Sequence, residues 1–356
     1  MTNILTPTLS RINFSEDNNT QQHLHSLLTS EGISDIEAHY SNGLSKYIEK
    51  ITVEIVTDPS KCKALWNSFS PKKTLFQTWE FKKSFLDAYK YKPYFILIKN
   101  ETENLALLPL WYDDKNFWTK VKHYCWFGSN WSEDNTFFVK DENYIPLLLY
   151  LAPSPIELDA IPQNIASAIS DKVTLLPDDS KYIINLKDIN SLDEYFDSLK
   201  KKKRYNLRRD IRKIDTENPK FIFNRYDDLD FIIKINKSRF IKDKADWEDP
   251  RRIQTFKNII NNSGKSYNIK FISIEIGGQL CASDIIATYN GTYLPLKGAS
   301  NFKDHSGLGF YISLVEIEDA IKSGFDRIDF LQEDCGWKKP MMQEVPLFKY
   351  VSGFKT

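Results

Sequence analysis

Residues Tyr293–Lys338 read YLPLKGAS, NFKDHSGLGF, YISLVEIEDAIKSG and FDRIDFLQEDCGWK. The first segment predicts an apolar strand, the second a turn at Ser306–Gly309, and the third an amphipathic helix from about Leu308 to Lys322. A second strand, FDRIDFL, and a polar loop complete the stretch. Helix N-termini carry unpaired N–H groups that bind anions, and glycines let the backbone approach a ligand closely. The turn therefore indicates either a pyrophosphate site or a plain strand-to-helix connection.

The composition limits the class of protein. The chain has 356 residues, 41% of them hydrophobic, and its 48 basic and 48 acidic residues give a formal net charge of zero. Proteins that bind polyanions through overall charge are usually basic, so any nucleic-acid contact must rest on a local patch. The four cysteines lie far apart without a Cys-x-x-Cys pair, which argues against a zinc site, a redox motif and a disulfide framework. No metal site is expected.

The N-terminal sequence MTNILTPTLSRINFSEDNN lacks the basic and then apolar pattern of a signal peptide. The longest apolar run, Ile145–Ala152, is too short to cross a bilayer. We therefore expect a cytoplasmic protein without a transmembrane segment. Residues 1–48 are polar and predict an extension whose histidines, His23, His25 and His39, are surface residues rather than metal ligands.

Two ordered halves follow the extension. In the first, ITVEIVTD alternates apolar and polar residues as a half-buried strand does, and helical and strand patterns follow it. In the second, three strand patterns are joined at Gly277-Gly278 and Asn290-Gly291, which are strong hairpin signals. We predict an α/β (α+β) protein with domains at 49–180 and 181–356. Each domain is expected to have a mixed, mostly antiparallel sheet flanked by helices.

A strongly basic helix is predicted at the start of the second half, within Ser191–Asp215. Lys200, Arg204, Arg208 and Arg212 recur every four residues and so form one cationic stripe. Like charges at this spacing repel one another unless an anion offsets them. The stripe is either a solvated helix face or a contact for a phosphorylated cofactor, an acidic substrate, an RNA backbone or the other domain.

Several of these segments together resemble the GNAT-type acyltransferases of the CelD/FemAB-like group. KKKKRYNLRRDIRKI is similar to the group's arginine-rich helix. HSGLGFYISLVEIEDAIKSG resembles its turn and helix, with Ser306 in place of a proline. DFLQEDCGWKK is similar to its Asp-to-Lys segment, with Asp329 and Lys338 in register. FQTWEFKKSF, LALLPLWY and WFGSN match its first domain more loosely, so the resemblance covers about residues 51–351.

The chain departs from the pattern of this group at four positions. Glu333 replaces a glycine, Cys335 an acidic residue and Trp337 a tyrosine. Asp304 stands where the family's pyrophosphate loop usually opens with Arg or Gln. A carboxylate beside a pyrophosphate is unfavourable, and the neighbouring Lys303, His305 and turn amides are the groups that would offset it.

The resemblance implies two tandem GNAT-like domains and an acyltransferase. Acyl-CoA would be a co-substrate, with no permanently bound cofactor, and the acyl group would pass directly to an amine or hydroxyl of a small metabolite or cell-envelope precursor. The backbone of Leu294–Ala299 would hold the donor and supply an oxyanion-binding N–H. The expected donor-binding residues are His305, Ser306, Gly307, Leu308 and Gly309.

The expected catalytic residues are Asp329, Lys338 and Asp284. Asp329 would act as a base or orient the amine, or else be a salt-bridged strand carboxylate. Lys338 would bind an anionic group, or else be a surface lysine; Asp284 is a further candidate base. Cys335 is expected to be an inert thiol, because no His or Asn accompanies it in sequence. The expected substrate-binding residues are Arg204, Arg208, Arg212, Tyr293 and Trp337.

Two alternatives stay open. One is a FemAB-like aminoacyltransferase that takes its donor from aminoacyl-tRNA, with the tRNA bound through the Lys200–Lys213 patch. The other is a non-catalytic GNAT-like protein that binds a carrier or partner, as the departures at Asp304, Glu333 and Trp337 suggest.

Overall fold

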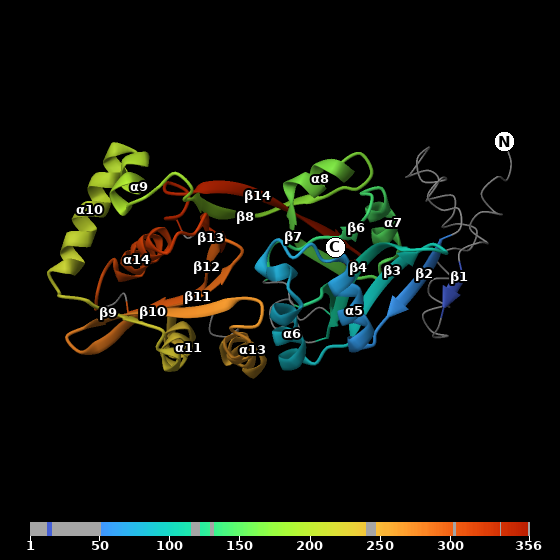
Figure 1. Ribbon diagram of the computed structural model, residues 1–356, viewed down its shortest axis with the longest axis horizontal. Helices are drawn as coiled ribbons and strands as arrows, with labels where there is room; N and C mark the ends of the chain where they lie inside the picture. The colour runs from blue at the N-terminus through green and yellow to red at the C-terminus, as the bar shows by residue number, and fades with distance from the viewer. Residues whose placement is uncertain are drawn as a thin grey trace. The chain divides into compact units, whose positions relative to one another are not determined.

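The computed structural model describes residues 51–114, 122–128, 132–239, 247–301, 304–334 and 336–354, and the backbone of strand β1 (Asn13–Ser15) (Figure 1). The rest of the polar extension, Lys303 and Cys335 lie outside these residues. The chain divides into two compact units. Unit 1 contains residues 1–71, 90–178 and 347–356, and unit 2 contains residues 72–89 and 179–346. The units are therefore not contiguous in sequence, whereas the sequence suggested a single boundary near residue 180.

Unit 1 has a mixed sheet in the order β1-β2-β3-β4-β5-β7-β14. The strands are β2 (Thr52–Val56), β3 (Pro93–Lys99), β4 (Asn104–Asp113), β5 (His123–Trp126), β7 (Ile156–Pro162) and β14 (Gln343–Ser352); β6 (Phe138–Val139) pairs with β4. β1/β2 and β5/β7 are parallel, and the other pairs are antiparallel. The helices are α5 (Pro59–Phe69), α7 (Tyr144–Leu151) and α8 (Gln163–Ile169).

Local sequence explains where α5 begins, and the apolar residues of α7 explain its place in the core. Asp58 caps α5 by accepting a hydrogen bond of 2.8 Å from the N–H of Lys61, and Pro59 occupies the first turn, where no N–H is needed. Strand residues such as Ile96, Leu108 and Leu158 form one buried core with Ile145 and Leu148 of α7.

Unit 2 has a six-stranded path in the order β8-β13-β12-β11-β10-β9. The strands are β8 (Leu176–Asn185), β9 (Lys220–Phe223), β10 (Asn268–Ile276), β11 (Gln279–Tyr289), β12 (Thr292–Ser300) and β13 (Arg327–Gln332). β12 and β13 are parallel, and the other neighbours are antiparallel. The hairpins predicted at Gly277-Gly278 and Asn290-Gly291 are confirmed, because β10, β11 and β12 pair in succession.

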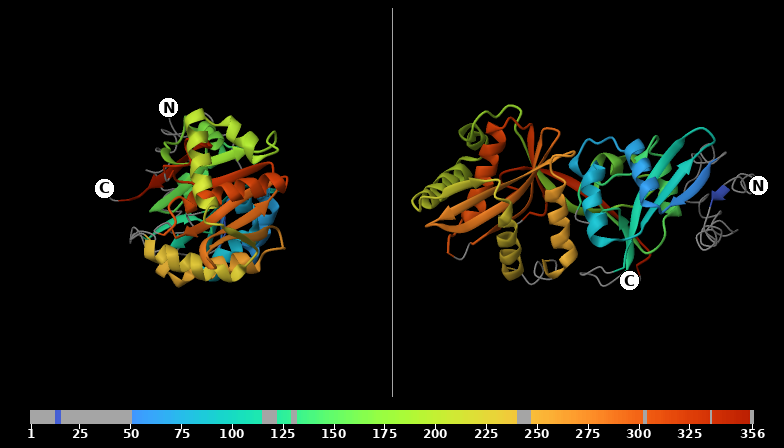
Figure 2. Two further views of the ribbon diagram at one scale, coloured as in Figure 1. Left: turned by 90° about the vertical axis from the view of Figure 1, so that its left-hand side faces the viewer. Right: turned by 60° about the horizontal axis from the view of Figure 1, so that its bottom comes forward.

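Helices cover both faces of the sheet in unit 2 (Figures 1 and 2). One face carries α14 (Leu308–Lys322) with α9 (Leu192–Ser198) and α10 (Lys201–Asp215), and their apolar residues share one core with the strands. The other face carries α11 (Leu229–Arg239) and α13 (Pro250–Asn261), with α6 (Trp79–Tyr89) packed against α13. Short 3-10 turns lie at Leu75–Gln77 and Tyr226–Asp228. The predicted fold class, mixed and mostly antiparallel sheets flanked by helices, is confirmed.

The structure corrects one predicted helix. The single helix expected within Ser191–Asp215 is divided into α9 and α10, and Lys200 between them has the extended ψ of 136°. Ser191 caps α9 by accepting a 3.1 Å hydrogen bond from the N–H of Glu194. The division places the carboxylates of α9 beside the arginines of α10. By contrast, the helix predicted from Leu308 to Lys322 has those bounds in α14.

We predict that Gly291→Ala destabilises unit 2 more than Gly278→Ala does. Both glycines have a left-handed φ, +68° and +79°, which costs alanine about 1 kcal/mol or more. Only at Gly291 would the added Cβ meet another group, 2.4 Å from Oδ2 of Asp326, and nothing lies within 4 Å at Gly278. The free energies of unfolding of the two variants in urea should differ by about 1 to 2 kcal/mol. Equal midpoints would show that Asp326 moves away from the added Cβ without loss of stability.

Candidate active site

Strands β12 and β13 run side by side only at their beginnings. Their parallel register contains two pairs, Thr292↔Arg327 and Tyr293↔Ile328. Further on, β13 continues its pairing with β8, while β12 stays on β11 as far as Ser300. The two strands therefore diverge, and no strand among the described residues pairs with the side of β12 that faces away from β11 over Leu294–Ala299. Backbone groups on such an edge can bind an extended ligand.

The helix after β12 begins at the edge of this opening. Gly307 caps α14 with a φ of +93°, and no atom lies within 4 Å of where its Cβ would be. A Cβ on Gly309 would lie 2.7 Å from Oγ of Ser300, so the helix packs closely on the end of β12. Among the described residues, the N–H groups of Gly307 and Gly309 have no hydrogen-bond acceptor. Two N–H donors and the positive end of the helix dipole therefore face the same region.

Carboxylates flank this turn. His305 contacts Glu217, which follows α10, with Nδ1 2.5 Å from Oε2. Asp304 accepts a 2.6 Å hydrogen bond from the side-chain amide of Asn301. The side chain of Leu308 is fully buried in the core. Of the five expected donor-binding residues, the two glycines thus offer backbone N–H groups, and Ser306 is exposed in the turn. His305 is engaged with a carboxylate, and Leu308 packs the helix.

A buried pair of carboxyl groups lies between β11 and α14. Asp284 of β11 stands opposite Gly298 of β12, and a Cβ on Gly298 would lie 2.0 Å from its Oδ1. The carboxyl group therefore rests directly over the backbone of β12, in a space that only glycine leaves free. Glu316 of α14 is 1% exposed, interacts with Asp284 through charge, and has an Oε1 atom without a hydrogen-bond partner among the described residues.

Burial controls the protonation of this pair. Desolvation raises the pKa of Asp284 to about 6, although hydrogen bonds from Glu316 and from the N–H of Ala299, and the charge of Lys297, all act to lower it. Desolvation, and then the charge of Asp284, raise the pKa of Glu316 well above its usual range. Both carboxyl groups therefore keep their protons to a higher pH than exposed carboxyl groups do. A carboxylate with a pKa near the working pH is suited to general base catalysis.

The two residues expected to be catalytic on β13 and its loop have other partners. Asp329 is 1% exposed, and its Oδ2 accepts a 2.9 Å hydrogen bond from Nζ of Lys181 on β8. Its Oδ1 accepts a 3.0 Å bond from the N–H of Leu331. Lys338 directs Nζ to the carbonyls of Phe330 at 2.7 Å and Gln332 at 2.6 Å. These contacts tie Asp329 to β8 and Lys338 to the end of β13.

The expected substrate-binding residues are dispersed. Tyr293 is fully buried and donates a 2.8 Å hydrogen bond to Asp319. Trp337 packs edge-on against Phe330 of β13 and Phe310 in the first turn of α14. Trp337 thus borders the opening, whereas Tyr293 belongs to the core.

The cationic stripe of α10 is partly neutralised by α9. Arg204 lies 2.8 Å from Asp197, and Arg208 lies 3.0 Å from Asp193. Tyr205 stands among the cations with 68% of its surface exposed. These carboxylates reduce the repulsion between the closely spaced arginines. Among the described residues, the exposed cations of α10 that make no ion pair are Lys201, Lys202, Arg212 and Lys213.

Sequence reasoning missed Glu316 and Gly298. Glu316 had a readable signal, because Leu308, Ile312, Glu316 and Ala320 recur every four residues and form one helical row. A carboxyl on an otherwise apolar row is a buried carboxyl. Gly298 had no such signal in the sequence, because the reason for a glycine there becomes visible only when the register places Asp284 opposite it.

No three His, Cys, Asp or Glu side chains within the described residues gather where they could hold a metal ion.

Comparisons with known proteins agree with this geometry. Residues 201–339 match the family model described as "Acetyltransferase (GNAT) domain". The structure of FemX matches with a TM-score of 0.53 and 11% identity, covering 84% of this chain and 98% of that one. A protein of unknown function from Bacteroides thetaiotaomicron VPI-5482 matches with a TM-score of 0.51 and 11% identity, covering 83% and 98%. No curated protein sequence matches.

No helix among the described residues is both long and apolar enough to span a membrane.

We predict that Glu316→Gln weakens the pH dependence of stability. Between the ordinary carboxyl pKa near 4 and the folded values near 6 and above, the folded state binds more protons than the unfolded state, so stability falls as pH rises. Glutamine keeps a donor for Asp284 and removes one of the two groups. The loss of stability from pH 4 to 7 should shrink by on the order of 2 kcal/mol in urea unfolding. Glu318→Gln, whose side chain is 42% exposed and pairs with Lys322, is the control; equal slopes in all three proteins would refute the buried pair.

Proposed function

We propose that this chain, which carries a GNAT acetyltransferase domain at residues 201–339 in a FemAB/CelD-like fold, is an acyltransferase. It moves an acyl group from acyl-CoA directly to an amine or hydroxyl of a small metabolite or cell-envelope precursor. The observation that carries the proposal is the divergence of β12 from β13 beside the N-terminus of α14. That arrangement supports a donor lying along β12 with its phosphates toward Gly307 and Gly309.

The residues of this chain have distinct roles in the proposed reaction. A backbone N–H within Leu294–Ala299 donates to the thioester carbonyl oxygen and stabilises the oxyanion that forms there. Asp284, over the β12 backbone at Gly298, accepts the proton that leaves the attacking amine. The amine nitrogen forms its bond to the carbonyl carbon, the carbon–sulfur bond breaks, and the leaving thiolate takes up a proton from water. Asp284 then releases the amine proton to solvent. Glu316 stays protonated and holds Asp284 in place.

We predict that Asp284→Asn separates donor binding from transfer. Asparagine preserves the shape but cannot accept the proton, so transfer should fall by about a hundredfold or more. Calorimetry with a panel of acyl-CoAs should give affinities close to those of the unchanged protein. The rate of the unchanged protein should rise with pH through about 6, because Asp284 must lose its proton, and the variant should lack this limb.

Calorimetry tests the donor, and the transfer assay tests the base. If no acyl-CoA binds the unchanged protein, acyl-CoA is not the donor. If donors bind but Asp284→Asn transfers at the full rate with the same pH profile, the donor assignment stands and Asp284 is not the base.

A second candidate function is aminoacyl transfer from aminoacyl-tRNA. The observation that favours it is the exposed face of α10, where Tyr205 stands one turn after Lys201 and Lys202, which make no ion pair within the described residues. Exposed aromatic rings stack on unpaired bases, and lysine and arginine bind the phosphate backbone. The carboxylates of Asp304 and Glu217 lie beside the glycine turn, where they would repel a pyrophosphate. A donor that places no pyrophosphate at this turn is therefore favoured.

We predict that, if tRNA is the donor carrier, Tyr205→Ala weakens its binding about tenfold through lost stacking. The double variant Lys202→Ala/Arg212→Ala should reduce the salt dependence of binding by about one logarithmic unit per lost phosphate contact. Arg208→Ala is the matched control with a smaller effect, because Asp193 already pairs with Arg208. Filter binding across a salt series measures all three, and no binding at low salt would eliminate this candidate.

A further inference from the structure

Strand β9 is the last strand of the sheet in unit 2, and it exposes aromatic rings. It reads Lys-Phe-Ile-Phe from Lys220 to Phe223 and pairs on one side with β10. Phe221 is 43% exposed and Phe223 is 48% exposed. Both residues stand opposite Ile274 and Ile272, on the face of the sheet that carries α14. Exposed large apolar side chains side by side usually mark a contact surface.

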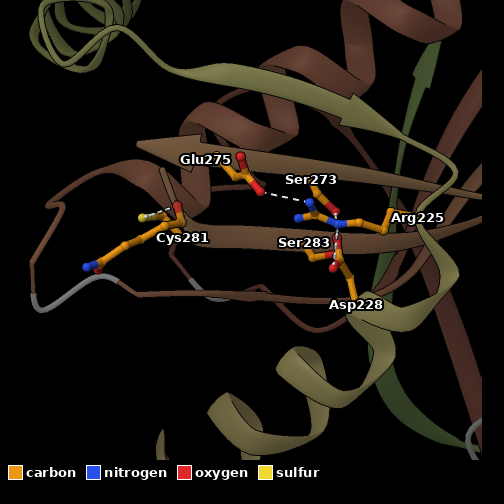
Figure 3. A network of polar contacts seen from close by, with 7 residues as sticks. Arg225, Asp228, Ser273, Glu275, Cys281 and Ser283 are labelled. Atoms are coloured by element: carbon orange, nitrogen blue, oxygen red, sulfur yellow. Dashed lines mark hydrogen bonds and ion pairs between the residues drawn. The ribbon is translucent and has the colours of Figure 1, made fainter. Parts of the chain in front are cut away.

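The inner side of β9 is firmly held. Phe221 stacks on Tyr311 of α14, with ring centroids 6.2 Å apart. Directly after the strand, Arg225 joins Asp228 at 2.8 Å and Glu275 of β10 at 2.7 Å (Figure 3). Figure 3 also shows Asp228 bonded to Ser273, which in turn contacts Ser283. The strand therefore presents a rigid outer edge.

The hydrogen-bond register tells which backbone groups point outward. The N–H of Asn224 donates to the carbonyl of Phe271 on β10 at 2.9 Å. Because directions alternate along an antiparallel strand, Ile222 also bonds toward β10, and Phe221 and Phe223 direct their N–H and C=O groups away from it. Among the described residues, none bonds to these outward groups. Natural sheets usually protect such an edge with a charge, a proline, a bulge or a short strand. Here Pro219 and Lys220 stand at the start of the four-residue β9, and the Phe-Ile-Phe segment that follows has no charge, proline or bulge.

We propose that β9 pairs with β9 of a second copy of this chain, extending the sheet across a two-fold axis at Ile222. The segment Phe-Ile-Phe is the same in both directions about Ile222, so a two-fold rotation places Phe221 opposite the partner's Phe223. This is the self-complementarity that a symmetric interface requires. An arbitrary extended peptide has no such match to the edge.

The register follows from the outward groups. Pairing Phe221 with the partner's Phe223, and Phe223 with the partner's Phe221, forms two hydrogen-bonded pairs on the same sheet face. A slip that pairs Phe221 or Phe223 with its own copy forms only one such pair. Cross-strand aromatic pairs add stability of their own. Charge does not oppose the association, because the formal net charge is zero and Lys220 falls opposite the partner's Asn224.

The direct test is a disulfide between the two copies at position 222. In this register Ile222 and the partner's Ile222 form a non-hydrogen-bonded pair with Cα atoms about 4.5 Å apart, within the span of a disulfide. Ile222→Cys, in a full-length chain with Cys335→Ser, should form a covalent dimer under mild oxidation; Cys62, Cys125 and Cys281 are buried. Phe221→Cys is the matched control, because its copies would lie about 9 Å apart, too far to bridge.

Sedimentation equilibrium measures the association without a cross-link. The unchanged chain should be in a monomer–dimer equilibrium, and Phe221→Thr/Phe223→Thr should raise the dissociation constant about tenfold or more. Tyr205→Ser, which removes an exposed aromatic ring from α10, should leave the constant unchanged. A purely monomeric unchanged chain, equal cross-linking of both cysteine variants, or a dimer insensitive to the double substitution would each overturn the proposal. A chain that is monomeric but gains backbone amide protection at β9 from an added peptide would assign the edge to a peptide instead.

Discussion

The divergence of β12 from β13 is the constraint on which the rest of unit 2 depends. Two parallel strands that pair along their full length leave no backbone edge for a ligand. Here the pairing stops after Tyr293 and Ile328, and buried polar groups contact β13 beyond that point. Lys181 binds Asp329, and Lys338 binds the carbonyls of Phe330 and Gln332. Such groups are costly to bury unpaired, so each contact holds the others in place.

The opening brings together groups that come from distant parts of the chain. The backbone edge belongs to β12, the N–H groups of Gly307 and Gly309 lie at the start of α14, and the carboxyl group of Asp284 belongs to β11. Gly298 joins them, because the missing side chain lets the carboxyl of Asp284 lie over β12. Burial raises the pKa of both Asp284 and Glu316, so ionisation of this pair opposes folding as the pH rises.

The sequence alone predicts much of this fold for physical reasons. Alternation, hairpin turns and the glycines before a helix are local signals, and the predicted α14 and the β10-β11-β12 meander agree with the structure. The division between α9 and α10 was not predicted, because the stripe of cations continued the helical period through Lys200. The noncontiguous units were not predicted either, since the packing of α6 on α13 is a contact between residues far apart in sequence.

Site residues were harder to predict than strands, because a carboxyl or an amine is identified by its partners. Asp329 and Lys338 are conspicuous in the sequence, yet the structure engages both with buried groups of β8 and β13. Asp284 drew less attention, although its carboxyl group lies over the backbone of β12 at Gly298. Glu316 follows from the helical row that it interrupts, and Gly298 required the register of β11 against β12.

Hydrogen–deuterium exchange with a non-transferable acyl-CoA analogue tests the central claim most directly. If the donor lies along the open edge of β12, amide protection should increase in peptides covering Leu294–Ala299 and Ser306–Gly309. Peptides from β9 and from unit 1 should exchange as before. Binding of the analogue without protection of these two segments would contradict the assignment of the donor site to the space between β12 and β13.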